Sequence, residues 1–223
     1  MSVLSPFPKT LGALPASAAQ RRYLFLAASW ASFAMMAVEM LFARIVASFF
    51  GSGIAVWGSI ITVLLVAMAA GYLWGGRLTQ HQQASSTRFY QLLLWFALAM
   101  LPLVLMADLV LAEISYWIAD SRYGSLIASA LLLSAPGFLS GCLNPYALHL
   151  LVQRVEEAGT RAGQLSALTT LGAAAGTILP SYYLVLWWEL NHILLGLVLV
   201  TAALAALALL LWPAAGKKVQ HVQ

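Results

Sequence analysis

A glutamate and an arginine stand inside an otherwise apolar stretch of this sequence. Glu39 and Arg44 both lie in "AVEMLFARIVASFFGSG", residues 37–53. A charged side chain near the centre of a bilayer costs about 3 kcal/mol or more, so its presence there calls for a structural or chemical reason. A carboxylate in such a place could bind a cationic group or carry a proton, and a guanidinium could form an ion pair or reach towards the membrane surface.

The spacing of these two residues limits what they can do together. Five residues correspond to about 140° of helix rotation, so Glu39 and Arg44 do not share a face and do not form a simple salt bridge within one helix. Glu39 is expected to meet a partner on another helix or to face a cavity, and both a substrate or proton role and a packing role stay open. For Arg44 we favour a structural or interfacial role.

A second polar feature is the pair Asn144-Pro145 in a later apolar run. Proline has no backbone N–H, so Pro145 leaves the carbonyl of Gly141 without its usual donor, and with Pro136 it predicts a kinked helix. Freed backbone groups line many transporter sites. Equally, Asn144 or a serine hydroxyl could satisfy the broken position.

Three further residues have two interpretations each. Thr169 and Thr170 could line a polar path, although we favour hydroxyls that bond back to their own helix. Asp108 could join Glu39 in an acidic mouth at the outer end of the third apolar run, or it could simply lie in the membrane interface.

Small residues recur four positions apart in three of the apolar runs, at Gly71 and Gly75, Gly137 and Gly141, and Gly172 and Gly176. Such spacing clears one face of a helix so that a neighbouring backbone can approach closely. We favour ordinary helix packing over a sliding or dimerising face.

The composition defines the broad class of protein. Of the 223 residues, 62% are hydrophobic and 8% are charged, whereas soluble domains have about 25% charged residues. Basic residues lie in loops and tails and form no helix face interleaved with aromatic residues, which argues against a nucleic-acid partner. The single Cys142 excludes an internal disulfide and a cysteine metal cluster, and no metal, cofactor or catalytic motif is expected. The sequence therefore predicts a polytopic membrane protein that is not an enzyme.

Six membrane-spanning helices are expected within a transmembrane region of residues 23–212, between a cytoplasmic tail of residues 1–22 and another of residues 213–223. The predicted spans are residues 23–49, 54–76, 89–112, 124–152, 161–186 and 190–212. With both ends inside, nearly all Lys and Arg residues of the loops and tails fall on the cytoplasmic side and only Arg122 falls outside, as the positive-inside rule expects. This predicts a multi-pass protein of the cell inner membrane.

Two stretches together resemble a known family. They are "EMLFARIVASFFGSGIAVWGSIITVLLVAMAAGYLWGGRL", from Glu39 to Leu78, and "PGFLSGCLNPYALHLLVQRVEEAGTRAGQLSALTTLGAAAGTILPSYYLV", from Pro136 to Val185. They are similar to the membrane domain of fused major-facilitator/spermidine-synthase-like proteins. The resemblance implies an all-α bundle of about six transmembrane helices, like half of a major facilitator transporter.

The chain also departs from that family. Only "PAAGKKVQHVQ" follows Trp212, with no strand–glycine turn–helix unit for a synthase domain, so the aminopropyl-transfer chemistry is not carried over. "GGRL" resembles the cytoplasmic loop motif of major facilitators and implies gating at Arg77, but Thr79 and Gln80 follow where an acidic residue is common.

These observations lead to one function hypothesis and one alternative. The first is a transporter-like protein that moves a small cationic metabolite such as a polyamine and pairs with itself as a homodimer in the lipid bilayer. The alternative is a membrane scaffold for a separately encoded spermidine-synthase-like enzyme, bound through "RVEEAGTR" and the C-terminal tail. The expected substrate-binding residues are Glu39, Asn144, Asp108 and Thr169. The expected structural or gating residues are Arg44, Arg77, Pro145, Gly172 and Gly176.

Overall fold

The computed structural model describes residues 17–81 and 85–212, and every regular secondary-structure element in these ranges is a helix. The expected all-α class is thus confirmed. The two tails that were expected to be cytoplasmic, residues 1–22 and 213–223, lie for the most part outside the described residues. The helices are α1 (Ala18–Phe50), α2 (Ile54–His81), α3 (Ser86–Trp117), α4 (Ser121–Leu151), a short 3₁₀ turn (Val155–Glu157), α5 (Ala158–Leu179), a π turn (Pro180–Leu184), α6 (Val185–Trp187) and α7 (Leu190–Leu211).

Five of these helices are long and apolar enough to cross a membrane, namely α1, α2, α3, α4 and α7. The shortest of them, α7, has 22 residues, which at 1.5 Å per residue gives about 33 Å, enough for the hydrocarbon core. The chain is therefore a multi-pass membrane protein. The first helix begins at Ala18, ahead of the expected start at residue 23, because the Ser17 hydroxyl caps it by accepting from the backbone N–H of Gln20.

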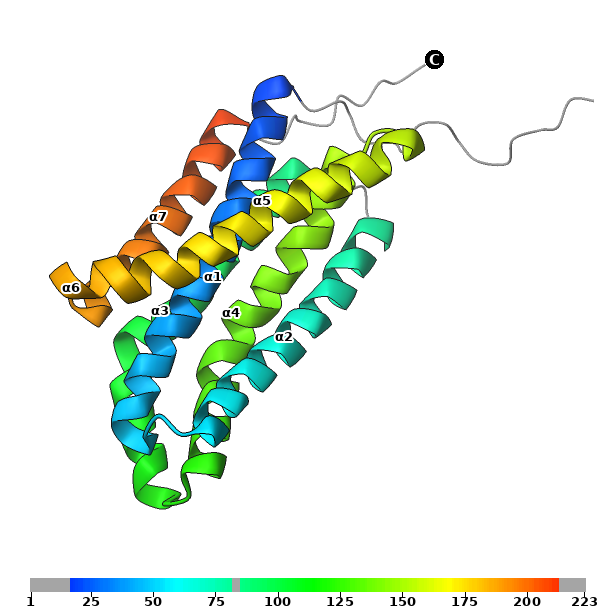
Figure 1. Ribbon diagram of the computed structural model, residues 1–223. Coiled ribbons are helices and arrows are strands. Elements are labelled where there is room, and N and C mark those ends of the chain that lie inside the picture. The colour runs from blue at the N-terminus through cyan, green and yellow to red at the C-terminus, as the bar shows by residue number, and fades with distance from the viewer. Residues whose placement is uncertain (1–16, 82–84, 213–223) are drawn as a thin grey trace, which may run out of the picture.

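The fifth expected span, residues 161–186, is helical but differs from the others. The helix α5 is not among the five that are apolar enough to span by themselves, because its sequence "AGTRAGQLSALTTLGAAAGTIL" is rich in Gly, Ala, Thr and Ser. In Figure 1 α5 crosses diagonally over α1 and continues through the π turn into α6. Its contacts are mostly with α1, and it touches α4 far less.

The central helix of the bundle is α1. It contacts α2, α3, α4, α5 and α7, while α2 lies along α4, and α3 packs against both α4 and α7 (Figure 1). In the most apolar part of α1, 61% of the residues are buried, against 33% in α2. A polar side chain on most faces of α1 is therefore enclosed by neighbouring helices.

Glycines lie at two close helix contacts, one between α2 and α4 and the other between α5 and α1. A Cβ on Gly71 would overlap the backbone of Phe138, and one on Gly141 would overlap the backbone of Met68, so α2 and α4 pack through their backbones. Gly172 and Gly176 pack in the same way on α1. All three small-residue pairs thus lie in contacts within one chain.

The connections are short where the predicted spans meet. Gly51 ends α1 with a φ of 79°, which favours glycine, and its N–H donates to the carbonyl of Ala47. Between α6 and α7 only Trp188 and Glu189 are extended. These two turns lie at the breaks that the sequence predicts.

Candidate functional site at the contact of α1 and α4

Glu39 is the one charged residue that is buried within the described part of the chain, with 7% of its surface exposed. It forms no hydrogen bond or ion pair with another described residue. Every fully inaccessible side-chain nitrogen or oxygen in the described ranges has a hydrogen-bond partner. The Glu39 oxygens therefore keep some accessible surface.

Helix geometry shows which neighbour Glu39 faces. Glu39 and Phe50 are eleven residues apart, which is about 1100° of rotation, or only about 20° more than three full turns. They therefore share a face of α1, and at Phe50 this face contacts Gly124 of α4. Because α1 and α4 run in opposite directions, Glu39 lies at the depth of α4 residues near 135.

The segment of α4 at this depth carries two more oxygen groups. Pro136 is buried and has no N–H, so the carbonyl of Leu132 lacks its usual helical donor. Ser140 is 5% exposed, and its hydroxyl makes no hydrogen bond to another described residue. Leu132 and Ser140 are eight residues apart, or about 12 Å along α4, so the freed carbonyl and the hydroxyl lie on either side of the depth of Glu39.

The other buried serine and threonine hydroxyls differ from Ser140 because each donates to a carbonyl one turn earlier in its own helix. The donors are Ser125, Ser129, Thr169 and Thr201. The oxygen groups at the depth of Glu39 are all acceptors of hydrogen bonds or ligands for hard cations. This set suits an ammonium group or a proton carrier. In the described residues, no three His, Cys, Asp or Glu side chains come together to hold a metal ion.

Asn144 and Pro145 lie one turn further along α4, and both are half-buried. The helix continues through Pro136 and Pro145 as one element. The Pro145 ring packs where a Cβ on Gly75 of α2 would lie, at 2.9 Å. Pro145 thus belongs to the α2–α4 contact, while Asn144 is close enough in depth to Ser140 to extend the polar set.

Thr169 and Asp108 form no hydrogen bond or ion pair with Glu39. The hydroxyl of Thr169 donates to the carbonyls of Leu165 and Ser166 in its own helix, at 2.9 and 3.1 Å. Asp108 is exposed on the outer face of α3, next to the highly exposed Leu109. Asp108 thus differs from Glu39, which is buried in α1.

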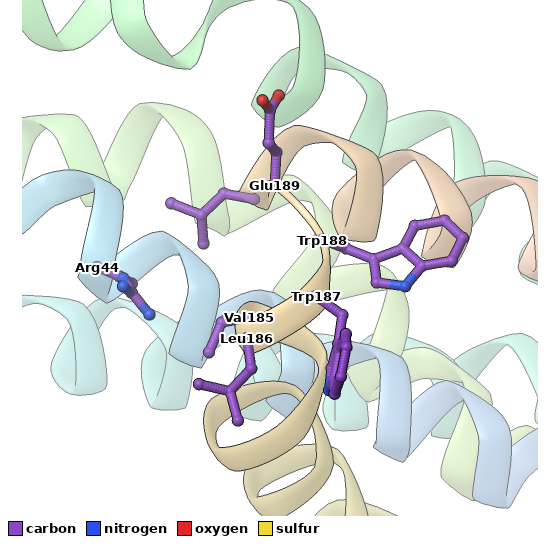
Figure 2. Close-up of a pocket in the computed structure, with 7 residues that line it drawn as sticks. Arg44, Val185, Leu186, Trp187, Trp188 and Glu189 are labelled. Carbon is purple, nitrogen blue, oxygen red and sulfur yellow. The ribbon is translucent and has the colours of Figure 1, made fainter.

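The two arginines of interest lie at opposite ends of the bundle, and both are exposed. Arg77 is near the end of α2 and has no ion pair with a described residue. Arg44 lines a shallow depression between α1 and the turn from α6 to α7, where Figure 2 shows it beside Val185 and Leu186. Neither arginine is a partner of Glu39.

Sequence reasoning missed Ser140. Its signal is the spacing "PGFLS", in which a serine follows a buried proline by four positions and so lies on nearly the same face of the helix. Burial distinguishes it from Ser134 on the same helix, which is exposed and donates to the carbonyl of Ala130.

Fold and site together define an all-helical, multi-pass membrane protein with an oxygen-lined position at the contact of α1 and α4. No family model, curated protein or solved structure matches the chain. Its function must therefore be argued from these residues.

Proposed function

We propose that this chain is a membrane carrier for a small cationic metabolite, with Glu39 as the group that binds the positive charge. The observation that supports this most is the burial of Glu39 without a cationic or hydrogen-bonding partner among the described residues. A carboxylate that only held helices together would need such a partner, because a buried unpaired charge is destabilising. An exchangeable cation would provide one.

Substrate recognition would use the oxygen groups at the depth of Glu39. A primary ammonium has three N–H donors and no acceptor, so it suits the Glu39 carboxylate together with one of the two flanking oxygens, the Ser140 hydroxyl or the Leu132 carbonyl. The resemblance to fused major-facilitator/spermidine-synthase-like proteins points to a polyamine as the substrate class.

The carrier would work as a pair of chains. Facilitator sites lie between two six-helix halves, and this chain would supply one half. The outward face of α5 supports pairing, because Gln164, Ser166 and Thr170 are exposed on it, and amides and hydroxyls are costly to leave in hydrocarbon. Crosslinking in native lipid, or mass measurement in lipid particles, is expected to find dimers. Monomers alone would contradict this part of the proposal.

The decisive experiment is uptake of labelled putrescine and spermidine into liposomes that contain the purified protein. The variant Glu39→Gln removes the buried charge and keeps the shape, and Asp108→Asn makes the same chemical change at an exposed position. We expect uptake by the wild type and by Asp108→Asn, and none by Glu39→Gln. Equal uptake by both variants would remove Glu39 from the mechanism, and no uptake by the wild type under any pH gradient would contradict a carrier.

A second candidate, a scaffold for a separately encoded synthase-like enzyme, has one observation in its favour. The connection between α4 and α5 exposes Arg154 and Glu156 at the end of the bundle where α1 begins (Figure 1). Such a charged connection suits contact with a soluble protein. Affinity purification from native membranes is expected to recover that enzyme, and the reversal Arg154→Glu with Glu156→Arg is expected to release it. Recovery of the same proteins with wild type and reversal would contradict the scaffold.

A further inference from the structure

A depression in the described part of the chain lies on the side of the bundle, between α1 and the turn from α6 to α7. Its volume is about 510 Å³, and it is open rather than enclosed. Arg44 of α1 forms one side, and residues 185–190 form the rest (Figure 2). It is distinct from the position of Glu39, which faces α4.

A local irregularity of the chain shapes this depression. Pro180 has no N–H to continue the ladder of α5, and the following turn is a π turn in which the N–H of Val185 donates to the carbonyl of Pro180. After α6, Trp188 and Glu189 are extended, and α7 begins at once. The widened turn and the sharp reversal leave apolar side chains around a hollow instead of a closed helix contact.

The charge in the depression is unbalanced. Arg44 forms no ion pair with a described residue. The other charged residue of the lining, Glu189, has its carboxylate 3.5 Å from Nδ1 of His192, and in Figure 2 this carboxylate points away from Arg44. The side of the depression next to α1 is therefore cationic.

The depression also lies at the depth of a membrane interface. The 22 residues of α7 span about 33 Å, close to the hydrocarbon thickness, which places their start at Leu190 near the headgroups. Trp187 and Trp188, directly before it, are 83% and 63% exposed. Exposed tryptophans at this position are typical of the aromatic belt.

We propose that this depression binds an anionic phospholipid of the leaflet at the α1–α2 end of the bundle. The Arg44 guanidinium binds the headgroup phosphate, since its planar donors match phosphate oxygens. Val185, Leu186 and Leu190 contact the start of an acyl chain. The proposal does not depend on transport, because Arg44 and Glu39 lie on different faces of α1.

Native mass spectrometry of the purified protein in detergent, titrated with phosphatidylglycerol or phosphatidylcholine, tests this lipid site. The wild type is expected to retain phosphatidylglycerol in preference to phosphatidylcholine. The variant Arg44→Gln is expected to bind it about tenfold more weakly, as the loss of one charge-assisted contact predicts, and Arg44→Lys to lie between the two. The control Arg77→Gln removes an exposed arginine at the other end of the bundle and is expected to change nothing. Equal retention by Arg44→Gln and the wild type would overturn the proposal.

A second variant and a competitor complete the test. Leu186 is 72% exposed, so Leu186→Asp is expected to fold and to repel the phosphate, with a loss similar to that of Arg44→Gln. Glycerol phosphate at millimolar concentration is expected to leave the bound lipid in place, because it lacks acyl chains. Displacement of the lipid by glycerol phosphate would assign the site to soluble phosphates and would overturn the proposal of a lipid site.

Discussion

Gly172 of α5 lies directly on the backbone carbonyl of Ser29 of α1, so closely that a methyl group on Gly172 would overlap that oxygen. The Ser29 hydroxyl in turn donates to the carbonyl of Leu168, at 2.8 Å. One turn along, Gly176 packs in the same way on Phe33. The helix with the least apolar sequence is thus held on α1 by backbone contact and a hydrogen bond, which polar membrane helices use in place of hydrophobic burial.

This contact predicts the effect of a single methyl group. Gly172→Ala is expected to lower the free energy of unfolding in detergent micelles by about 1–3 kcal/mol, because the overlap is with backbone that cannot rotate away. Gly163→Ala is the control on the same helix, since a Cβ there meets nothing within 4 Å. Equal stability of the two variants would show that α5 does not pack on α1 as described.

A second prediction concerns the contact between α1 and α7. The indole Nε1–H of Trp30 donates to the Thr201 hydroxyl at 2.9 Å, and that hydroxyl donates to the carbonyl of Leu197. A double-mutant cycle of Trp30→Phe and Thr201→Val is expected to give a coupling energy of about 0.5–1.5 kcal/mol, in the range of hydrogen bonds between membrane helices. Additive effects of the two substitutions would mean that this bond contributes nothing to stability.

The third prediction separates a structural from a binding role for Glu39. Removing one partner of a buried ion pair costs about 3–5 kcal/mol, but Glu39 has no such partner among the described residues. Glu39→Gln is therefore expected to leave the protein at least as stable as the wild type. Thermal unfolding in detergent, with Asp108→Asn as the exposed control, measures this directly. A loss of several kcal/mol confined to Glu39→Gln would reveal a packing role instead.

Much of the fold follows from local patterns in the sequence. The apolar runs predict the spans that became α1, α2, α3, α4 and α7, and the breaks at Gly51 and Glu189 lie where polar or small residues interrupt them. The early start of α1 was missed because one capping serine, Ser17, is a weak signal beside the long apolar run that follows.

The candidate site was only half predictable. A glutamate within an apolar run marks Glu39 from sequence alone, and helix rotation already separates it from Arg44. Its neighbours depend on the register between α1 and α4, which is set by long-range contacts such as that of Phe50 with Gly124. No local pattern encodes that register, so Ser140 was missed.

Ser140 gives the sharpest test of that register. If its hydroxyl accepts a bond from a cation held by Glu39, Ser140→Ala removes one charge-assisted hydrogen bond and is expected to weaken amine binding about tenfold or more. The fold should be unaffected, because the hydroxyl makes no bond to the described residues that would be lost. Ser129→Ala is the matched control on α4, since that hydroxyl already donates to the carbonyl of Ser125, at 2.7 Å. Spermidine binding by calorimetry on the purified variants measures both. Equal affinities for the two would place the cation away from α4 and would leave Glu39 without the oxygen partners that its depth in the bundle assigns to it.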